Sequence, residues 1–296
     1  MSARSVVVFG DSVTWGQGLL DTHKLGTLVA SGLSPAGELV VDMRAHSGAV
    51  VGAPDLVELA AVDGEVPVGL PSTFEQVESF QPSHPPALVI VNGGINDVDI
   101  RRLLNPFMDI GHLRALTRRY CGDRMRLLLN LLRARIGDVP IVVVGYYPVL
   151  STESHPFRMP FLLAVNGVGL PLFVPHELVF AKIVTQCEVF WEESDLALRR
   201  AVDTSNADAG DSRAIFVTPG FTRRNSTFAP EPWLWGLNGD FEPQDEVIVT
   251  RRASCVAAIP EFDVFAREQC FRASAGHPNV AGAQAYATAI LAVVQP

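Results

Sequence analysis

The sequence has few cysteines, no long apolar run and no cluster of basic residues. No apolar run reaches the roughly 18 to 20 residues that cross a bilayer, so we expect no integral membrane segment. Lys and Arg together number 23 against 32 Asp and Glu, which gives a formal net charge of −9. Nucleic acid phosphates would repel such a surface. We therefore expect no nucleic acid partner, and a ligand that is small or neutral.

Four cysteines in 296 residues do not make a disulfide scaffold, and their spacing lacks the paired short motifs of a zinc site. We expect no metal and no cofactor. Cys255 and Cys270 could pair across their loop, but two ordinary thiols are the favoured interpretation in a reducing compartment. The chain runs from Met1 into an apolar strand with no separate signal-like segment, so we expect a cytoplasmic protein.

Hydrophobic residues make up 48% of the chain and charged residues 19%, which excludes disorder and suits strands that are covered on both faces. Apolar runs alternate with segments of helical periodicity. This alternation predicts an α/β protein, a three-layer α/β/α sandwich around a five-stranded parallel sheet. The predicted strands are 6–9, 38–43, 87–91, 140–148 and 214–217; the predicted helices are 25–33, 55–62, 73–80, 113–136 with an interruption near Gly122, 176–202, and a last helix that runs through Ala292.

No repeat, linker or break in composition divides the chain, so we expect a single domain over residues 1–296. Two stretches, 151–175 and 221–265, have no clear periodicity and are long for connections in a compact domain. We interpret both as lid or pocket insertions. The first could instead pack on the core for stability alone. The second contains aromatic residues around Trp233 that could line a pocket.

Three predicted strands end in small polar residues, and ligands bind at the carboxyl ends of strands in open α/β sheets. Ser12 follows the first strand and is a candidate nucleophile, although Asp11 and Ser12 could simply cap the next helix. Asn96 follows the third strand and could be an ordinary turn residue. His277 precedes the last helix, and Pro278 beside it fits a helix entrance.

Taken together, these blocks resemble a known family. The chain is similar to the SGNH hydrolases, also called GDSL esterases and lipases, through Gly10-Asp11-Ser12-Val13, Gly48, Gly94-Ile95-Asn96-Asp97 and His277, which occur in the family's order. The resemblance implies the flavodoxin-like SGNH hydrolase fold and cleavage of carboxylic esters. A leucine usually follows the serine in the first block, so Val13 is a mild departure.

The resemblance also implies roles for these residues. Ser12 would be the nucleophile and His277 the general base. The backbone N–H groups of Ser12 and Gly48 and the side-chain amide of Asn96 would form the oxyanion hole. Acyl transfer requires these three components. The substrate would be a small-molecule ester with an apolar acyl or aromatic group, because the 151–175 stretch and the surroundings of Trp233 are apolar.

One departure concerns the residue that orients the histidine. Family members with a full triad carry an aspartate three residues before the histidine, whereas this chain has Ser274. A backbone carbonyl could replace it, which would leave a Ser12–His277 dyad, or an acid could come from Asp240, Asp263 or Glu268. Two further alternatives stay open: an acyltransferase that uses the same site, and a ligand-binding protein without turnover.

Overall fold

A computed structural model describes residues 3–35, 37–52, 63–169 and 173–295. Its centre is a five-stranded sheet in the order β2-β1-β3-β4-β5, and every pair of neighbouring strands is parallel. The predicted sheet is therefore confirmed. The strands are β1 (Arg4–Phe9), β2 (Leu39–Met43), β3 (Pro86–Val91), β4 (Ile141–Val144) and β5 (Ala214–Val217).

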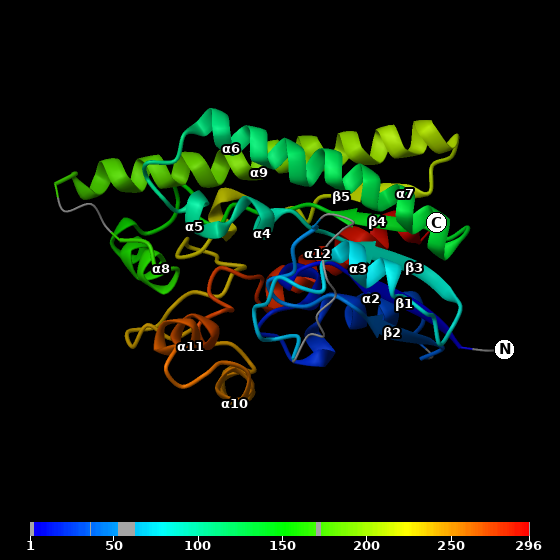
Figure 1. The fold of residues 1–296 in the computed structure, drawn as a ribbon, viewed down its shortest axis with the longest axis horizontal. Coiled ribbons are helices and arrows are strands. Elements are labelled where there is room, and N and C mark those ends of the chain that lie inside the picture. The colour runs from blue at the N-terminus through cyan, green and yellow to red at the C-terminus, as the bar shows by residue number, and fades with distance from the viewer. Residues whose placement is uncertain (1–2, 36, 53–62, 170–172, 296) are drawn as a thin grey trace.

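Helices cover both faces of this sheet (Figure 1). On one face, α2 (Leu25–Leu33) packs against α12 (Val280–Val294). On the other face lie α3 (Thr73–Glu78), α7 (Met125–Ile136) and α9 (His176–Ala209), and α6 (Ile110–Thr117) packs on α9. The predicted three-layer sandwich is confirmed. Among the residues that the structure describes, none of the helices is both long enough and apolar enough to span a bilayer.

The central strands form because their side chains are buried on both faces of the sheet. Every residue from Val6 to Phe9 in β1 is fully buried, and the same holds for β4 apart from a trace of exposure at Ile141. Burial of one such side chain stabilises the fold by roughly 1.5–3 kcal/mol. These continuous apolar runs explain why the strand positions were predictable from the sequence.

The helices follow the predicted pattern with two differences. The predicted interruption near Gly122 is a π-helical segment, Arg118–Arg124, that joins α6 to α7. Helix α9 continues to Ala209 rather than ending at Val202, and Gly210 closes it in the left-handed conformation with φ of 67°. The predicted helix over 55–62 lies outside the described residues.

The two stretches predicted to be irregular contain helices. In 151–175 the chain forms α8 (Met159–Val165), with Pro160 in the first turn, where a missing N–H costs nothing. The 221–265 stretch contains α10 (Ile248–Ala258) and the start of α11 (Val264–Phe271). Figure 1 shows α8, α10 and α11 gathered beyond one end of the sheet. The remaining short elements are α1 (Ser12–Trp15), α4 (Ile95–Val98), α5 (Ile100–Leu103) and 3-10 turns at Asp21–His23, Pro156–Arg158 and Arg223–Asn225.

A disulfide between Cys255 and Cys270 joins α10 to α11. The expectation of two ordinary thiols was therefore wrong. Cys255 lies in the last turn of α10 and Cys270 in the last turn of α11, and the two helices pack against each other, which brings the sulfurs together across a sequence separation of 15 residues. The other two cysteines, Cys121 and Cys187, are free and buried.

Candidate active site

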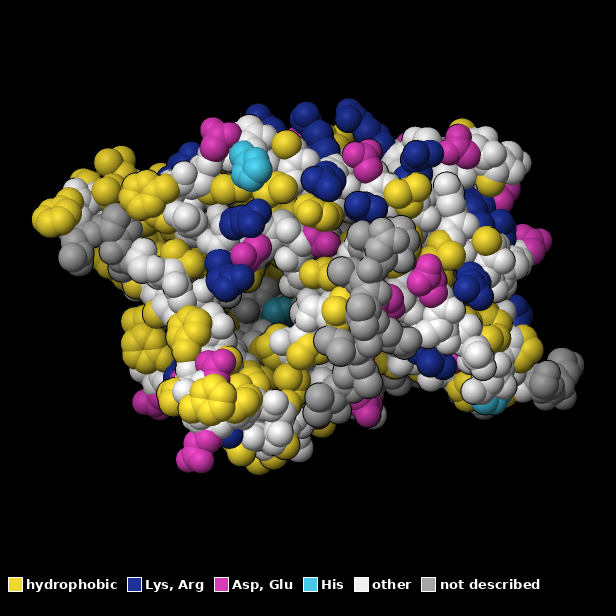
Figure 2. All heavy atoms as spheres, in the orientation of Figure 1, with side chains coloured by type: hydrophobic (Ala, Val, Ile, Leu, Met, Phe, Trp, Pro, Cys, Tyr) yellow, Lys and Arg dark blue, Asp and Glu magenta, His cyan; other side chains and the backbone are white. Residues whose placement is uncertain are grey.

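The sheet topology brings the predicted site residues to one place. Strand β1 lies between β2 and β3, so the chain leaves β1 for one neighbour and returns on its other side. Such a reversal opens a crevice at the carboxyl ends of the strands. Ser12, Gly48 and Asn96 follow β1, β2 and β3 in turn, and all three line a single cavity with His277. Figure 2 shows a hollow on this face of the molecule with a histidine side chain inside it.

Ser12 is the first residue of α1, and Asp11 before it caps this helix. The Asp11 carboxylate accepts a hydrogen bond of 2.9 Å from the backbone N–H of Val13. It also accepts hydrogen bonds of 2.8 Å from the amide of Asn92 and from the hydroxyl of Tyr146. The capping interpretation therefore applies to Asp11, whose burial raises its pKa, and not to the Ser12 side chain. Asn92 and Tyr146 were not among the predicted site residues, although Asn92 directly follows β3 and Tyr146 comes two residues after the end of β4.

The structure brings Ser12 and His277 together across 265 residues of sequence. The hydroxyl oxygen of Ser12 lies 2.8 Å from Nε2 of His277. This is the separation of a hydrogen-bonded nucleophile and base. Both residues lie at the same cavity, and Ser12 is almost completely buried. The arrangement allows the imidazole to accept the hydroxyl proton directly.

The stretch around Trp233 supports the histidine and does not line the cavity beside Ser12. Trp233 itself lines a separate pocket together with residues of α12. The backbone of this stretch pairs with the segment that carries His277. The N–H of Trp235 donates to the carbonyl of His277 at 2.7 Å, and the N–H of Gly276 donates to the carbonyl of Trp235 at 2.8 Å. Pro278 pairs with Leu234 as an isolated bridge and lies before the helix cap rather than inside the helix.

Three hydrogen-bond donors come from residues that line the same cavity as the Ser12 hydroxyl. Within the described parts of the chain, the backbone N–H groups of Ser12 and Gly48 donate to no protein acceptor. Gly48 has a φ of 81°, and a Cβ there would lie 2.7 Å from the backbone nitrogen of Val68, so a glycine is needed. The Asn96 amide donates one hydrogen to the carbonyl of Ala49 at 2.9 Å. Its second hydrogen is available to an oxyanion.

Asp97, which follows Asn96, is hydrogen-bonded to the segment after Gly48. Its carboxylate accepts hydrogen bonds from the backbone N–H groups of Val51 at 2.8 Å and Gly52 at 3.3 Å. Burial raises the pKa of Asp97 despite these bonds. Because Val51 and Gly52 follow Gly48 closely, Asp97 fixes the distance between Gly48 and Asn96.

The environment of His277 makes the imidazole a weak base. Loss of water around the ring is the main cause that lowers its pKa from 6.5 to about 4, and the charge of Arg251 lowers it further. The backbone carbonyls of Ser274, Ala275 and Ala273 act in the opposite direction. His277 is therefore neutral at neutral pH.

The structure places none of the predicted acids on His277. The buried Nδ1 of the ring makes no hydrogen bond to any described residue. Asp240 is exposed, Asp263 caps α11, and Glu268 pairs with Arg272. The hydroxyl of Ser274 instead donates to Asp245, which was not predicted as a partner because 29 positions separate the two residues.

The cavity beside Ser12 has a volume of about 210 Å³. Pockets for drug-sized ligands run from about 300 to 1,000 Å³, so this one admits a smaller group. Its walls are mostly apolar, and the charged residues Arg101 and Arg272 also line it. The apolar lining comes from Val13, Pro67, Ile95, Ile100, Leu104, Tyr147, Val149, Leu162, Val165, Ala273 and Ala275.

Solved structures of known proteins are similar to this chain at low sequence identity. A search of curated proteins gives no match. An extracellular lipase from Streptomyces rimosus is similar at 17% identity with a TM-score of 0.48, over 81% of this chain and 90% of that chain. Phospholipase A1 from Streptomyces albidoflavus is similar at 16% identity with a TM-score of 0.43, over 80% of this chain and 89% of that chain.

A protein-family model matches this chain. The model described as the GDSL-like lipase/acylhydrolase family matches residues 8–165, which is just over half of the chain. The matched range contains Ser12, Gly48 and Asn96. The chain therefore belongs to the GDSL-like lipase/acylhydrolase family, the SGNH hydrolases.

Proposed function

We propose that this protein is a carboxylic ester hydrolase that forms an acyl-enzyme on Ser12. One observation carries the proposal: the Ser12 hydroxyl lies 2.8 Å from Nε2 of His277 at a cavity where backbone N–H groups without protein partners converge. A nucleophile, a base and oxyanion donors are the parts that acyl transfer needs.

The reaction would proceed in two steps. Nε2 of His277 takes the proton of Ser12 as the hydroxyl oxygen attacks the ester carbonyl carbon. The N–H groups of Ser12 and Gly48 and the amide of Asn96 donate hydrogen bonds to the oxyanion. His277 then returns the proton to the departing alcohol oxygen. Water repeats the sequence on the acyl-enzyme, with His277 again as base, and releases the carboxylic acid.

The shape of the cavity supports a short acyl chain or a single aromatic ring as the group that enters it. The apolar walls favour such a group over a sugar, which would need more hydrogen-bond partners. A volume of about 210 Å³ leaves little room for a long chain.

The test is hydrolysis of p-nitrophenyl butyrate together with covalent labelling by a fluorophosphonate. The wild-type protein should hydrolyse the ester and take up one label, and Ser12→Ala should do neither. Ser47→Ala is the matched control, because Ser47 lines the same cavity but its hydroxyl makes no hydrogen bond to a histidine of the described chain, so labelling should stay intact. An unlabelled wild-type protein, or full activity in Ser12→Ala, would contradict the proposal. Ester products formed from an added alcohol would instead indicate an acyltransferase.

A further inference from the structure

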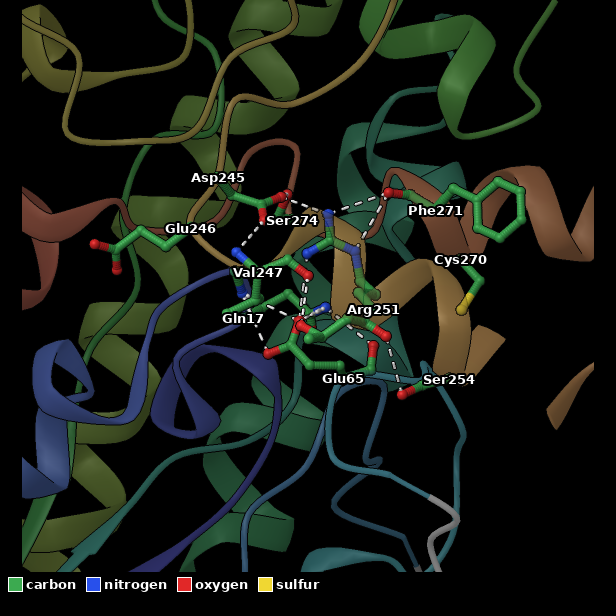
Figure 3. A network of polar contacts seen from close by, with 12 residues as sticks. Gln17, Glu65, Asp245, Glu246, Val247, Arg251, Ser254, Cys270, Phe271 and Ser274 are labelled. Carbon is green, nitrogen blue, oxygen red and sulfur yellow. Dashed lines mark hydrogen bonds and ion pairs between the residues drawn. The ribbon is translucent and has the colours of Figure 1, made fainter. Parts of the chain in front are cut away.

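A buried ionic network lies next to the segment that carries His277 (Figure 3). The Arg251 guanidinium and the Asp245 carboxylate form an ion pair, and the side chains of both have no exposed surface. Arg251 also contacts Glu65 at 3.3 Å and donates to the backbone carbonyl of Phe271 at 3.1 Å. Removing charges from water is costly, and a buried ion pair contributes little net stability. The location of this network is therefore more informative than its energy.

Asp245 reaches the histidine segment through one hydrogen bond. The hydroxyl of Ser274, which is completely buried, donates to the Asp245 carboxylate. The backbone carbonyl of Ser274 accepts the N–H of His277 at 2.9 Å. Asp245 makes no hydrogen bond to His277 itself within the described chain, so its hydrogen-bonded connection to the histidine segment runs through Ser274.

The same network reaches the other two catalytic loops. Glu65 accepts a hydrogen bond of 2.9 Å from the side chain of Gln17, five residues after Ser12. The carbonyl of Gly64 beside it accepts the N–H of Ser47 at 2.8 Å, next to Gly48. Arg251 therefore contacts both Glu65, which is hydrogen-bonded to the loop after Ser12, and Asp245. Asp245 in turn is hydrogen-bonded to the histidine segment through Ser274.

We propose that Asp245 is a positioning residue that compensates for the absent triad aspartate through the Ser274 hydroxyl. It holds the 273–277 turn, in which the N–H of His277 donates to the carbonyl of Ser274, and so keeps the imidazole within reach of the Ser12 hydroxyl. Arg251 compensates the buried negative charge of Asp245. This inference rests on the proposed function, since it concerns the base of that reaction.

Ser274 can link Asp245 to the histidine segment because of its position in the chain and because its hydroxyl is a hydrogen-bond donor. It occupies the position where relatives with a full triad carry the acid, yet its hydroxyl is used as a donor to Asp245. A Cβ added at Gly18 would lie 2.7 Å from Cβ of Ser274 and 3.0 Å from Cβ of Asp245, so the loop after Ser12 packs closely on both. A larger residue at position 274 would disturb that packing.

The first test is Ser274→Ala, which removes the hydroxyl, keeps the Asp245–Arg251 ion pair and leaves no new side chain to accommodate. A misplaced catalytic group can cost about 100-fold in rate. We expect kcat for p-nitrophenyl butyrate to fall by about 10- to 100-fold with KM little changed. The control is Ser254→Ala, because Ser254 on α10 also donates to a carboxylate, that of Asp63, but does not contact the histidine segment. It should retain wild-type kcat.

The second test is a double-mutant cycle with Asp245→Asn. If the two residues act as one unit, the double variant loses no more kcat than the worse single variant. The inference would be overturned if the losses of kcat in the two single variants multiplied in the double variant, or if Ser274→Ala left kcat unchanged. Neither outcome would affect the ester hydrolysis proposed for the wild type. A wild-type protein that neither hydrolyses the ester nor takes up fluorophosphonate would remove the proposed function as well.

Discussion

The side-chain amide of Asn96 donates a hydrogen bond to the backbone carbonyl of Ala49, 2.9 Å away. This bond orients the amide beside Gly48, so that two donors from different strand ends face the same cavity. An oxyanion donor is effective only if it is already in place when charge develops on the substrate. The Ala49 carbonyl provides that orientation.

Asn96→Ala should therefore lower kcat by about 100- to 1,000-fold, the usual cost of losing one oxyanion donor. Steady-state kinetics on p-nitrophenyl butyrate would measure the change. The control is Asn166→Ala, because Asn166 lines the same cavity and donates its amide to the carbonyl of Leu162. Equal losses of kcat in the two variants would contradict the oxyanion role of Asn96.

The pH dependence of kcat/KM should follow His277. Burial lowers the pKa of its imidazole to about 4, and only the neutral ring can accept the proton of Ser12. Activity should stay constant from neutral pH down to about pH 5 and fall as the pH drops through the pKa. A pH-rate profile in overlapping buffers gives the inflection. An inflection near 6.5 would mean that the ring is hydrated like a free histidine.

The acyl-chain preference should depend on Leu162, a buried residue of α8 that lines the cavity. Leu162→Ala removes side-chain volume from the wall, so kcat/KM for p-nitrophenyl octanoate should rise relative to that for the acetate. The neighbouring Leu163 is equally buried but does not line the cavity. Leu163→Ala should reduce stability without shifting the preference. The same shift in both variants would indicate a general loosening of α8.

Asp195 on α9 provides a test of stability that is independent of catalysis. Its Oδ1 atom is buried and has no hydrogen-bond partner in the described chain. Burial raises its pKa from 3.8 to about 7, against the opposing charge of Arg199. The folded state therefore holds this proton more tightly than the unfolded state, and the free energy of unfolding falls as the pH rises toward 7.

Asp195→Asn should remove this dependence, because the amide resembles the protonated acid. Between pH 5 and pH 8 the wild type should lose roughly 1 to 3 kcal/mol more than the variant. Urea unfolding at several pH values would measure it. Asp208→Asn is the control, since Asp208 is an exposed residue of the same helix paired with Arg126. A wild type whose stability changes no more than that of Asp195→Asn would show that the carboxylate is ionised at pH 5.

Much of the architecture was predictable because buried parallel strands are continuous apolar runs. Such runs end abruptly where a loop begins, so Ser12, Gly48 and Asn96 could be assigned to strand ends and expected to meet. The pairing of Ser12 with His277 was expected from the family resemblance, and the geometry agrees with it.

The support around the histidine was not predictable. Arg251 and Arg252 are adjacent in the sequence, yet the first is completely buried and the second is exposed. No local pattern distinguishes them, because the difference comes from contacts with residues as distant as Glu65. Helices α8 and α10 were missed because each is short and lies in a stretch rich in proline or loop residues.

The compartment stays a prediction. The sequence favoured the cytoplasm, whereas disulfides persist mainly in oxidising surroundings. The bond between Cys255 and Cys270 is therefore evidence in the opposite direction.

The disulfide also has a practical consequence. It joins the helix that carries Arg251 to the segment that leads into Ser274. Expression in a strongly reducing host would leave this covalent link unformed in some molecules and produce a mixture. Batches with the same purity could then differ in specific activity, so free thiols should be titrated before rates from different preparations are compared.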